Sequence, residues 1–142
     1  MGDDILRQMT SIRAVLFDIG GVIIRTDDPE PRQRLGERFG LDRDGMDRLV
    51  FGCPAAQAAE LGLETEEAVW RSVKQALGLN GEELIGFRRE FWAGDSLDLS
   101  LVELAASLRP GLKTGLLTNA WNPAPLSIFT LQYGLPVALA QA

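Results

Sequence analysis

The sequence contains no histidine and a single cysteine, Cys53. Without histidine the chain cannot form a Ser-His triad, a His-based acid–base pair or a His-ligated zinc site. A single cysteine cannot form a disulfide within the chain, so we expect a reducing, cytoplasmic setting. The first ten residues contain Asp3, Asp4 and Arg7 and no apolar run, so no signal peptide is predicted.

Basic residues are also few, because 14 Lys and Arg face 20 Asp and Glu and leave a formal net charge of -6. This balance argues against nucleic acid or an anionic membrane as a partner. A length of 142 residues with 46% hydrophobic residues is typical of one globular protein with its own core.

Charge is missing altogether from residues 114–142, whereas the first 113 residues hold every Lys, Arg, Asp and Glu of the chain. A membrane span is one explanation of such a stretch. However, only 17 residues follow Pro125, and they include Ser127, Gln132 and Pro136, which does not favour a span. We interpret this stretch as a truncated or frame-shifted end.

The apolar pattern alternates between strand and helix along the chain. Residues 13–17 predict a buried strand, residues 30–95 are helical throughout, residues 99–108 predict an amphipathic helix, and residues 113–119 predict a second strand. Within the helical block, Thr65 and Gly78 are typical of the start and end of one helix. The order predicts an α/β sheet with a helical lid.

Polar residues follow both predicted strands. The first strand runs into Asp18, then Gly20 and Gly21, and the second ends in Thr118 and Asn119. A charge at the end of a short apolar run is costly unless it lies at the carboxyl edge of a strand, facing a site. The two glycines permit a tight turn or the close approach of a bound group. We therefore expect both strand ends to lie at one edge of a parallel sheet, where such sheets bind ligands.

Residues 17–22 (FDIGGV), the helical block, and residues 116–121 (LLTNAW) together resemble the haloacid dehalogenase superfamily, in particular the members with a helical cap after the first motif. The resemblance implies an α/β fold with a Rossmann-like parallel sheet core and an inserted α-helical cap. The core, incomplete here, would comprise residues 12–26 and 97–142, and the cap residues 27–96.

The same resemblance implies a Mg²⁺-dependent phosphatase acting on a small phosphorylated metabolite. Asp18 would be the nucleophile and a Mg²⁺ ligand, and the carbonyl of Gly20 would be a second ligand. Thr118, Asn119 and Gly21 would bind the substrate, with the Thr118 hydroxyl on a phosphate oxygen and Asn119 orienting the group or its loop.

The chain departs from the pattern of that superfamily in two places. Gly20 stands where the phosphatases usually carry a general acid, which favours substrates such as haloacids whose leaving group needs no proton. In addition, no Lys, Arg, Asp or Glu follows Thr118, so the lysine and the acids of the later motifs are absent. We therefore expect a weak or inactive hydrolase in these 142 residues. A 2-haloacid dehalogenase, or a non-catalytic or vestigial protein that associates with itself through the exposed edge of residues 14–17, remain the alternatives.

Overall fold

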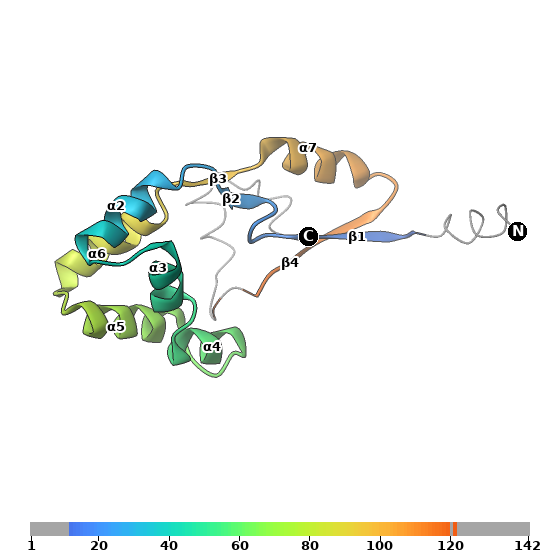
Figure 1. Ribbon diagram of the computed structural model, residues 1–142. Helices are drawn as coiled ribbons and strands as arrows, with labels where there is room; N and C mark the ends of the chain where they lie inside the picture. Colours follow the sequence, from blue (N-terminus) through green and yellow to red (C-terminus); the bar gives the residue numbers. More distant parts are fainter. Residues whose placement is uncertain (1–11, 120, 122–142) are drawn as a thin grey trace, which may run out of the picture. The chain divides into compact units, whose positions relative to one another are not determined.

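A computed structural model describes residues 12–119 and 121 (Figure 1). The chain divides into two compact units. In the described range, the sheet unit comprises residues 12–24 and 97–118, and the helical unit comprises residues 25–96 with Asn119 and Trp121. The sequence predicts a cap of residues 27–96 and assigns residues 119–121 to the core, whereas the compact helical unit begins at Arg25 and includes Asn119 and Trp121.

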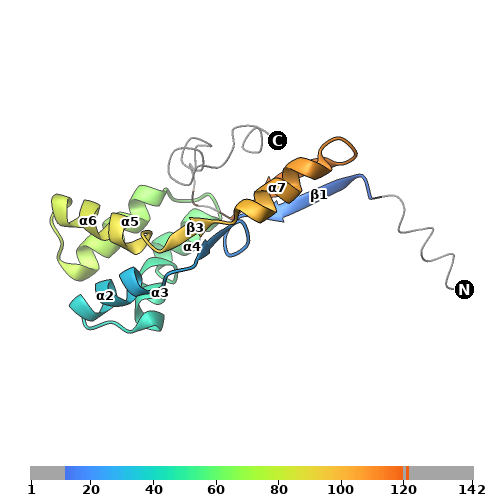
Figure 2. The ribbon, with the colours of Figure 1, turned by 90° about the horizontal axis from the view of Figure 1, so that it is seen from above.

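The sheet unit is built on two parallel strands. β1 (Ala14–Asp18) pairs with β4 (Lys113–Leu117), with Ala14 opposite Lys113 and Asp18 opposite Leu117. Helix α7 (Leu99–Leu108) precedes β4 and lies over one face of this sheet (Figures 1 and 2). The side chain of Asp98 caps α7 by accepting a hydrogen bond from the Leu101 amide at 3.1 Å. The predicted α/β class is confirmed, and so are the positions of the two predicted strands and of the 99–108 helix. The prediction that the first strand is buried is wrong for the described residues, because its residues alternate between exposed and half-buried.

The two faces of the β1–β4 sheet differ in exposure. Leu16 and Leu117 lie on one face, with 66% and 61% of their surface exposed. Val15 and Phe17 alternate with them on β1 and are half-buried. Among residues 12–119 and 121, no strand pairs with the second edge of β1. Parallel sheets are normally covered on both faces. Within the described residues, the face of Leu16 and Leu117 is exposed.

The helical unit consists of short helices between two three-residue strands. Its helices are α2 (Glu30–Arg38), α3 (Arg43–Val50), α4 (Pro54–Glu60), α5 (Glu66–Leu77) and α6 (Gly81–Phe91). Strand β2 (Ile24–Thr26) leads into them and pairs with β3 (Asp95–Leu97), which follows them. The sequence predicts neither β2 nor β3, because three residues are too few to show an alternating pattern.

Local signals explain where these helices begin and end. The Thr65 hydroxyl accepts a hydrogen bond from the Ala68 amide at 3.3 Å at the start of α5, and Gly78 ends this helix with a φ of 66°. Both roles are as predicted. At α6, Asn80 and Glu83 form a capping box, in which each side chain accepts a hydrogen bond from the other residue's backbone amide.

The core of the helical unit surrounds Trp70, which is fully buried. Its indole Nε1 donates a hydrogen bond to Glu66 Oε1 at 2.8 Å. The buried cluster comprises Leu35, Met46, Val50, Trp70, Val73, Phe87 and Phe91. Trp121 joins it, because its ring centroid lies 6.0 Å from that of Trp70 and 5.8 Å from that of Phe51. Trp70, Phe87 and Phe91 are therefore core residues, and the partly buried Trp92 packs against them.

Arg88 lies within ion pairs rather than on a purely solvated helix face. Its Nη2 lies 2.9 Å from Glu66 Oε1, and its Nη1 lies 3.1 Å from Glu67 Oε1. The guanidinium carbon also lies 5.1 Å from the ring centroid of Trp70. Arg88 thus connects α6 to the first turn of α5, a role that sequence spacing does not reveal.

The two ends of the helical unit are held together at Gly94. Its carbonyl accepts hydrogen bonds from the amides of Asp27 and Asp28, both at 3.1 Å. Next to it, Asp95 Oδ1 accepts hydrogen bonds from Thr26 Oγ1 at 2.6 Å and from Arg32 Nη2 at 3.3 Å. A Cβ on Gly94 would lie 1.8 Å from the Asp28 carbonyl oxygen, so this close contact requires glycine.

Candidate functional site

The carboxyl edge of the β1–β4 sheet brings two of the candidate residues together. Asp18 is the last residue of β1 and lies opposite Leu117, the last residue of β4, and Thr118 follows directly. The amide of Ile19 donates a hydrogen bond to the Leu117 carbonyl at 3.1 Å, which extends the pairing past Asp18. Because the strands are parallel, their polar ends share one edge, as the sequence predicts.

The turn after β1 is closed by backbone hydrogen bonds. The Ile24 amide donates to the Ile19 carbonyl at 2.9 Å, and the Gly21 amide donates to the Ile24 carbonyl at 2.8 Å. Gly21 has a φ of 76°, a left-handed conformation in which glycine is favoured. The buried side chains of Ile19 and Ile23 anchor the turn, so its backbone is fixed although Gly20 and Gly21 are exposed.

Asp18 and Thr118 are themselves exposed, together with Gly20 and Gly21. No atom lies within 4 Å of the position that a Cβ on Gly20 would occupy. A ligand can therefore reach both the Asp18 carboxylate and the Gly20 backbone from solvent. Asn119 directly follows Thr118 and is exposed as well, although its contacts group it with the helical unit.

The donor set at this edge is small for a divalent cation. Asp18 supplies one carboxylate, and Gly20, an exposed residue, supplies a backbone carbonyl. Within residues 12–119 and 121, no group of three Asp, Glu, Cys or His side chains lies close enough to hold a metal ion. Mg²⁺ prefers six oxygen ligands and often keeps several waters, so these two donors fit a weakly held, mostly hydrated ion.

Neither a scan against protein-family models nor a search of curated proteins found a match to this chain.

None of the helices in the described part of the chain is both long and apolar enough to cross a membrane.

Proposed function

We propose that this chain is a hydrolase of the haloacid dehalogenase type, acting as a phosphatase on a small phosphorylated metabolite through Asp18. The observation that carries the proposal is the register of β1 and β4, which ends both strands at one edge with Asp18 and Thr118. In this proposal the sheet unit is a partial Rossmann-like core and the helical unit is its cap.

The chemistry follows from the residues at this edge. A carboxylate oxygen of Asp18 attacks phosphorus, the bond from phosphorus to the leaving oxygen breaks, and an aspartyl phosphate forms. Water then attacks this phosphorus, which releases orthophosphate and restores the Asp18 carboxylate. The Thr118 hydroxyl, at the same strand edge as Asp18, would donate a hydrogen bond to the transferred phosphoryl group. Of the amides of the glycine turn, that of Gly21 already donates to the Ile24 carbonyl and would have to exchange this bond to reach the substrate. Mg²⁺ held by Asp18 and the Gly20 carbonyl would neutralise charge on the phosphate.

The same residues set the expected rate. Gly20 has no side chain that can protonate the leaving oxygen, so an alkoxide has to take its proton from water. Loss of a general acid typically costs on the order of 100- to 10,000-fold in rate. No lysine follows Thr118 to balance the charges of Asp18 and the phosphate. We therefore expect these 142 residues to be a weak catalyst that depends on a good leaving group.

Phosphatase kinetics test the proposal. With p-nitrophenyl phosphate, which releases a stable phenolate, we expect slow, Mg²⁺-stimulated turnover, and with an alkyl phosphate at least about 100-fold less. Asp18→Asn should abolish the reaction, whereas Asp44→Asn, an exposed change in the first turn of α3, should not alter it. Turnover that survives Asp18→Asn, or no turnover above that variant, would contradict the proposal.

The absence of an acidic side chain at Gly20 favours a second candidate reaction at the same site. Displacement of a halide from a 2-haloacid by Asp18 forms an ester that water hydrolyses, and the departing halide needs no proton. Release of chloride from 2-chloropropionate, lost in Asp18→Asn and insensitive to Mg²⁺ removal, would favour this reaction over the phosphatase.

The exposed face and edge of β1 favour a candidate of another class, a protein that associates with itself through this sheet. Leu16 is 66% exposed and lies on a strand with one paired edge in the described residues. Concentration-dependent dimerisation that Leu16→Lys abolishes, together with absence of Asp18-dependent turnover, would favour association over catalysis.

A further inference from the structure

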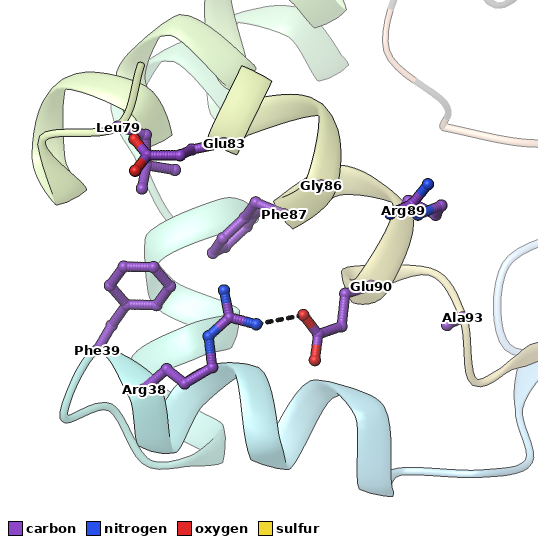
Figure 3. Close-up of a pocket in the computed structure, with 9 residues that line it drawn as sticks. All are labelled: Arg38, Phe39, Leu79, Glu83, Gly86, Phe87, Arg89, Glu90 and Ala93. Atoms are coloured by element: carbon purple, nitrogen blue, oxygen red, sulfur yellow. Dashed lines mark hydrogen bonds and ion pairs between the residues drawn. The ribbon is translucent and has the colours of Figure 1, made fainter. Parts of the chain in front are cut away.

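A groove of about 660 Å³ opens between the C-terminal part of α2 and helix α6, entirely within the helical unit (Figure 3). This volume lies within the range of about 300–1,000 Å³ that is usual for sites of small molecules. The residues that line it come from α2, from α6 and from the loops next to them. None of them belongs to the strand edge of Asp18, so the groove shares no residue with the proposed hydrolase site.

The floor of the groove is aromatic. Phe87 is 2% exposed and Phe39 is half-buried, and their ring centroids lie 5.8 Å apart with the rings tilted by 57°. Leu79, half-buried, adds a further apolar side chain. An aromatic or other flat apolar group fits such a surface, because tilted rings offer both faces and edges to a third ring.

An ion pair crosses the groove above this floor. Arg38 on α2 donates from Nη1 to Glu90 Oε2 on α6 at 2.5 Å, with 58% and 29% of the two side chains exposed (Figure 3). The guanidinium carbon of Arg38 also lies 5.7 Å from the ring centroid of Phe39. Exposed pairs of this kind contribute little to stability, so a competing anion can take the place of Glu90 at small cost.

The hydrogen-bond donors of the groove that remain available to a ligand belong to arginine side chains. Arg38 has five N–H donors, and in the described residues one of them makes the bond to Glu90. Arg89 also lines the groove and has no ion pair within residues 12–119 and 121. The acidic side chains are engaged, since Glu90 pairs with Arg38 and Glu83 Oε2 accepts from the Asn80 amide at 2.7 Å.

From this combination we infer that the groove binds a small aromatic carboxylate. Its ring lies against Phe39 and Phe87, and its carboxylate accepts hydrogen bonds from the guanidinium of Arg38 in place of Glu90. Glu90 thus competes with the ligand for Arg38.

The competition allows a test in which two variants act in opposite directions. The probe is 1-naphthoate, titrated into the 142-residue chain and followed by the backbone amide signals of Gly86 and Ala93 in NMR spectra. We expect saturable shifts of both signals. Arg38→Gln should weaken binding on the order of tenfold or more, because a charge-assisted hydrogen bond is lost. Glu90→Gln should strengthen binding, because the competing carboxylate is removed.

Three controls make the result specific. Arg34→Gln removes a charge from α2 outside the groove, at a residue paired with Glu30, and should leave the affinity unchanged. The neutral probe 1-naphthalenemethanol should bind on the order of tenfold more weakly than 1-naphthoate. Asp18→Asn should bind 1-naphthoate as the unchanged chain does, whatever its effect on turnover.

The inference would be overturned by weaker binding in both Arg38→Gln and Glu90→Gln, since this pattern indicates that the ion pair merely shapes the groove. Equal affinity for the neutral probe, the absence of saturable shifts, or shifts centred on Leu16 and Leu117 of the exposed sheet face would overturn it as well.

Discussion

The helical unit and the sheet unit bury their apolar side chains to different extents. Trp70, at the centre of the helical unit, has 0% of its surface exposed and is surrounded by buried residues of α2, α3, α5 and α6. Leu16, at the centre of β1, is 66% exposed. Trp70 lies on the buried face of an amphipathic helix and Leu16 lies in an apolar strand, so the difference arises from what packs against each element.

The comparison shows which unit is complete by itself. Short amphipathic helices cover one another, so the residues between Arg25 and Ser96, joined by Trp121, form a closed core. A parallel sheet is normally covered on both faces, and its strands pair with segments from distant parts of a sequence. We therefore expect most of the stability of the chain to reside in the helical unit, although the chemistry is proposed for the sheet unit.

The largest expected effect comes from removing the central side chain of the helical unit. Trp70→Ala leaves a cavity among buried residues and should lower the free energy of unfolding by about 3–5 kcal/mol. Leu16→Ala changes an exposed side chain and should cost about 0.5 kcal/mol or less. Urea titrations followed by circular dichroism measure both values. Similar losses in the two variants would show that the exposed face of β1 is covered in solution.

The second-largest expected change in stability comes from Gly94, where the two ends of the helical unit are held together. Gly94→Ala places a Cβ 1.8 Å from the Asp28 carbonyl oxygen and forces β2 and β3 apart locally, at a cost of about 3 kcal/mol. The matched variant Gly86→Ala lies within α6, where no atom stands within 4 Å of the new Cβ, and should stabilise the chain by about 0.5–1 kcal/mol. Thermal melts of the two variants should shift in opposite directions, and a shift in the same direction would contradict the close contact at Gly94.

The sequence predicted those elements whose ends are set by interactions between residues close together in the chain. Thr65 and Gly78 mark the ends of α5 because a hydroxyl cap and a left-handed glycine act within one turn of a helix. Strand β3 was not predicted, since Asp95, Ser96 and Leu97 form a strand through pairing with β2, far away in sequence. Helix α4 was not separated from the helical block, because its alanines show little apolar periodicity.

Part of the candidate site was predictable from the sequence, and part depends on packing between distant residues. Asp18 and Thr118 share an edge because both follow apolar strands, and parallel pairing then brings the two strand ends together. The grouping of Asn119 and Trp121 with the helical unit depends on the packing of Trp121 against Phe51 and Trp70, which no local pattern reports. The groove of Arg38 and Glu90 was missed for the same reason, since it exists only where α2 meets α6.

We propose above all that Asp18, at the carboxyl edge of the β1–β4 sheet, is a nucleophile. Intact-mass spectrometry of the chain, incubated with acetyl phosphate and Mg²⁺ and then quenched in acid, tests it most directly. We predict the gain of one phosphoryl group, removed by hydroxylamine as an acyl phosphate should be and absent in Asp18→Asn. A phosphoryl group that persists in Asp18→Asn, or an unchanged mass in the unaltered chain, would contradict the account.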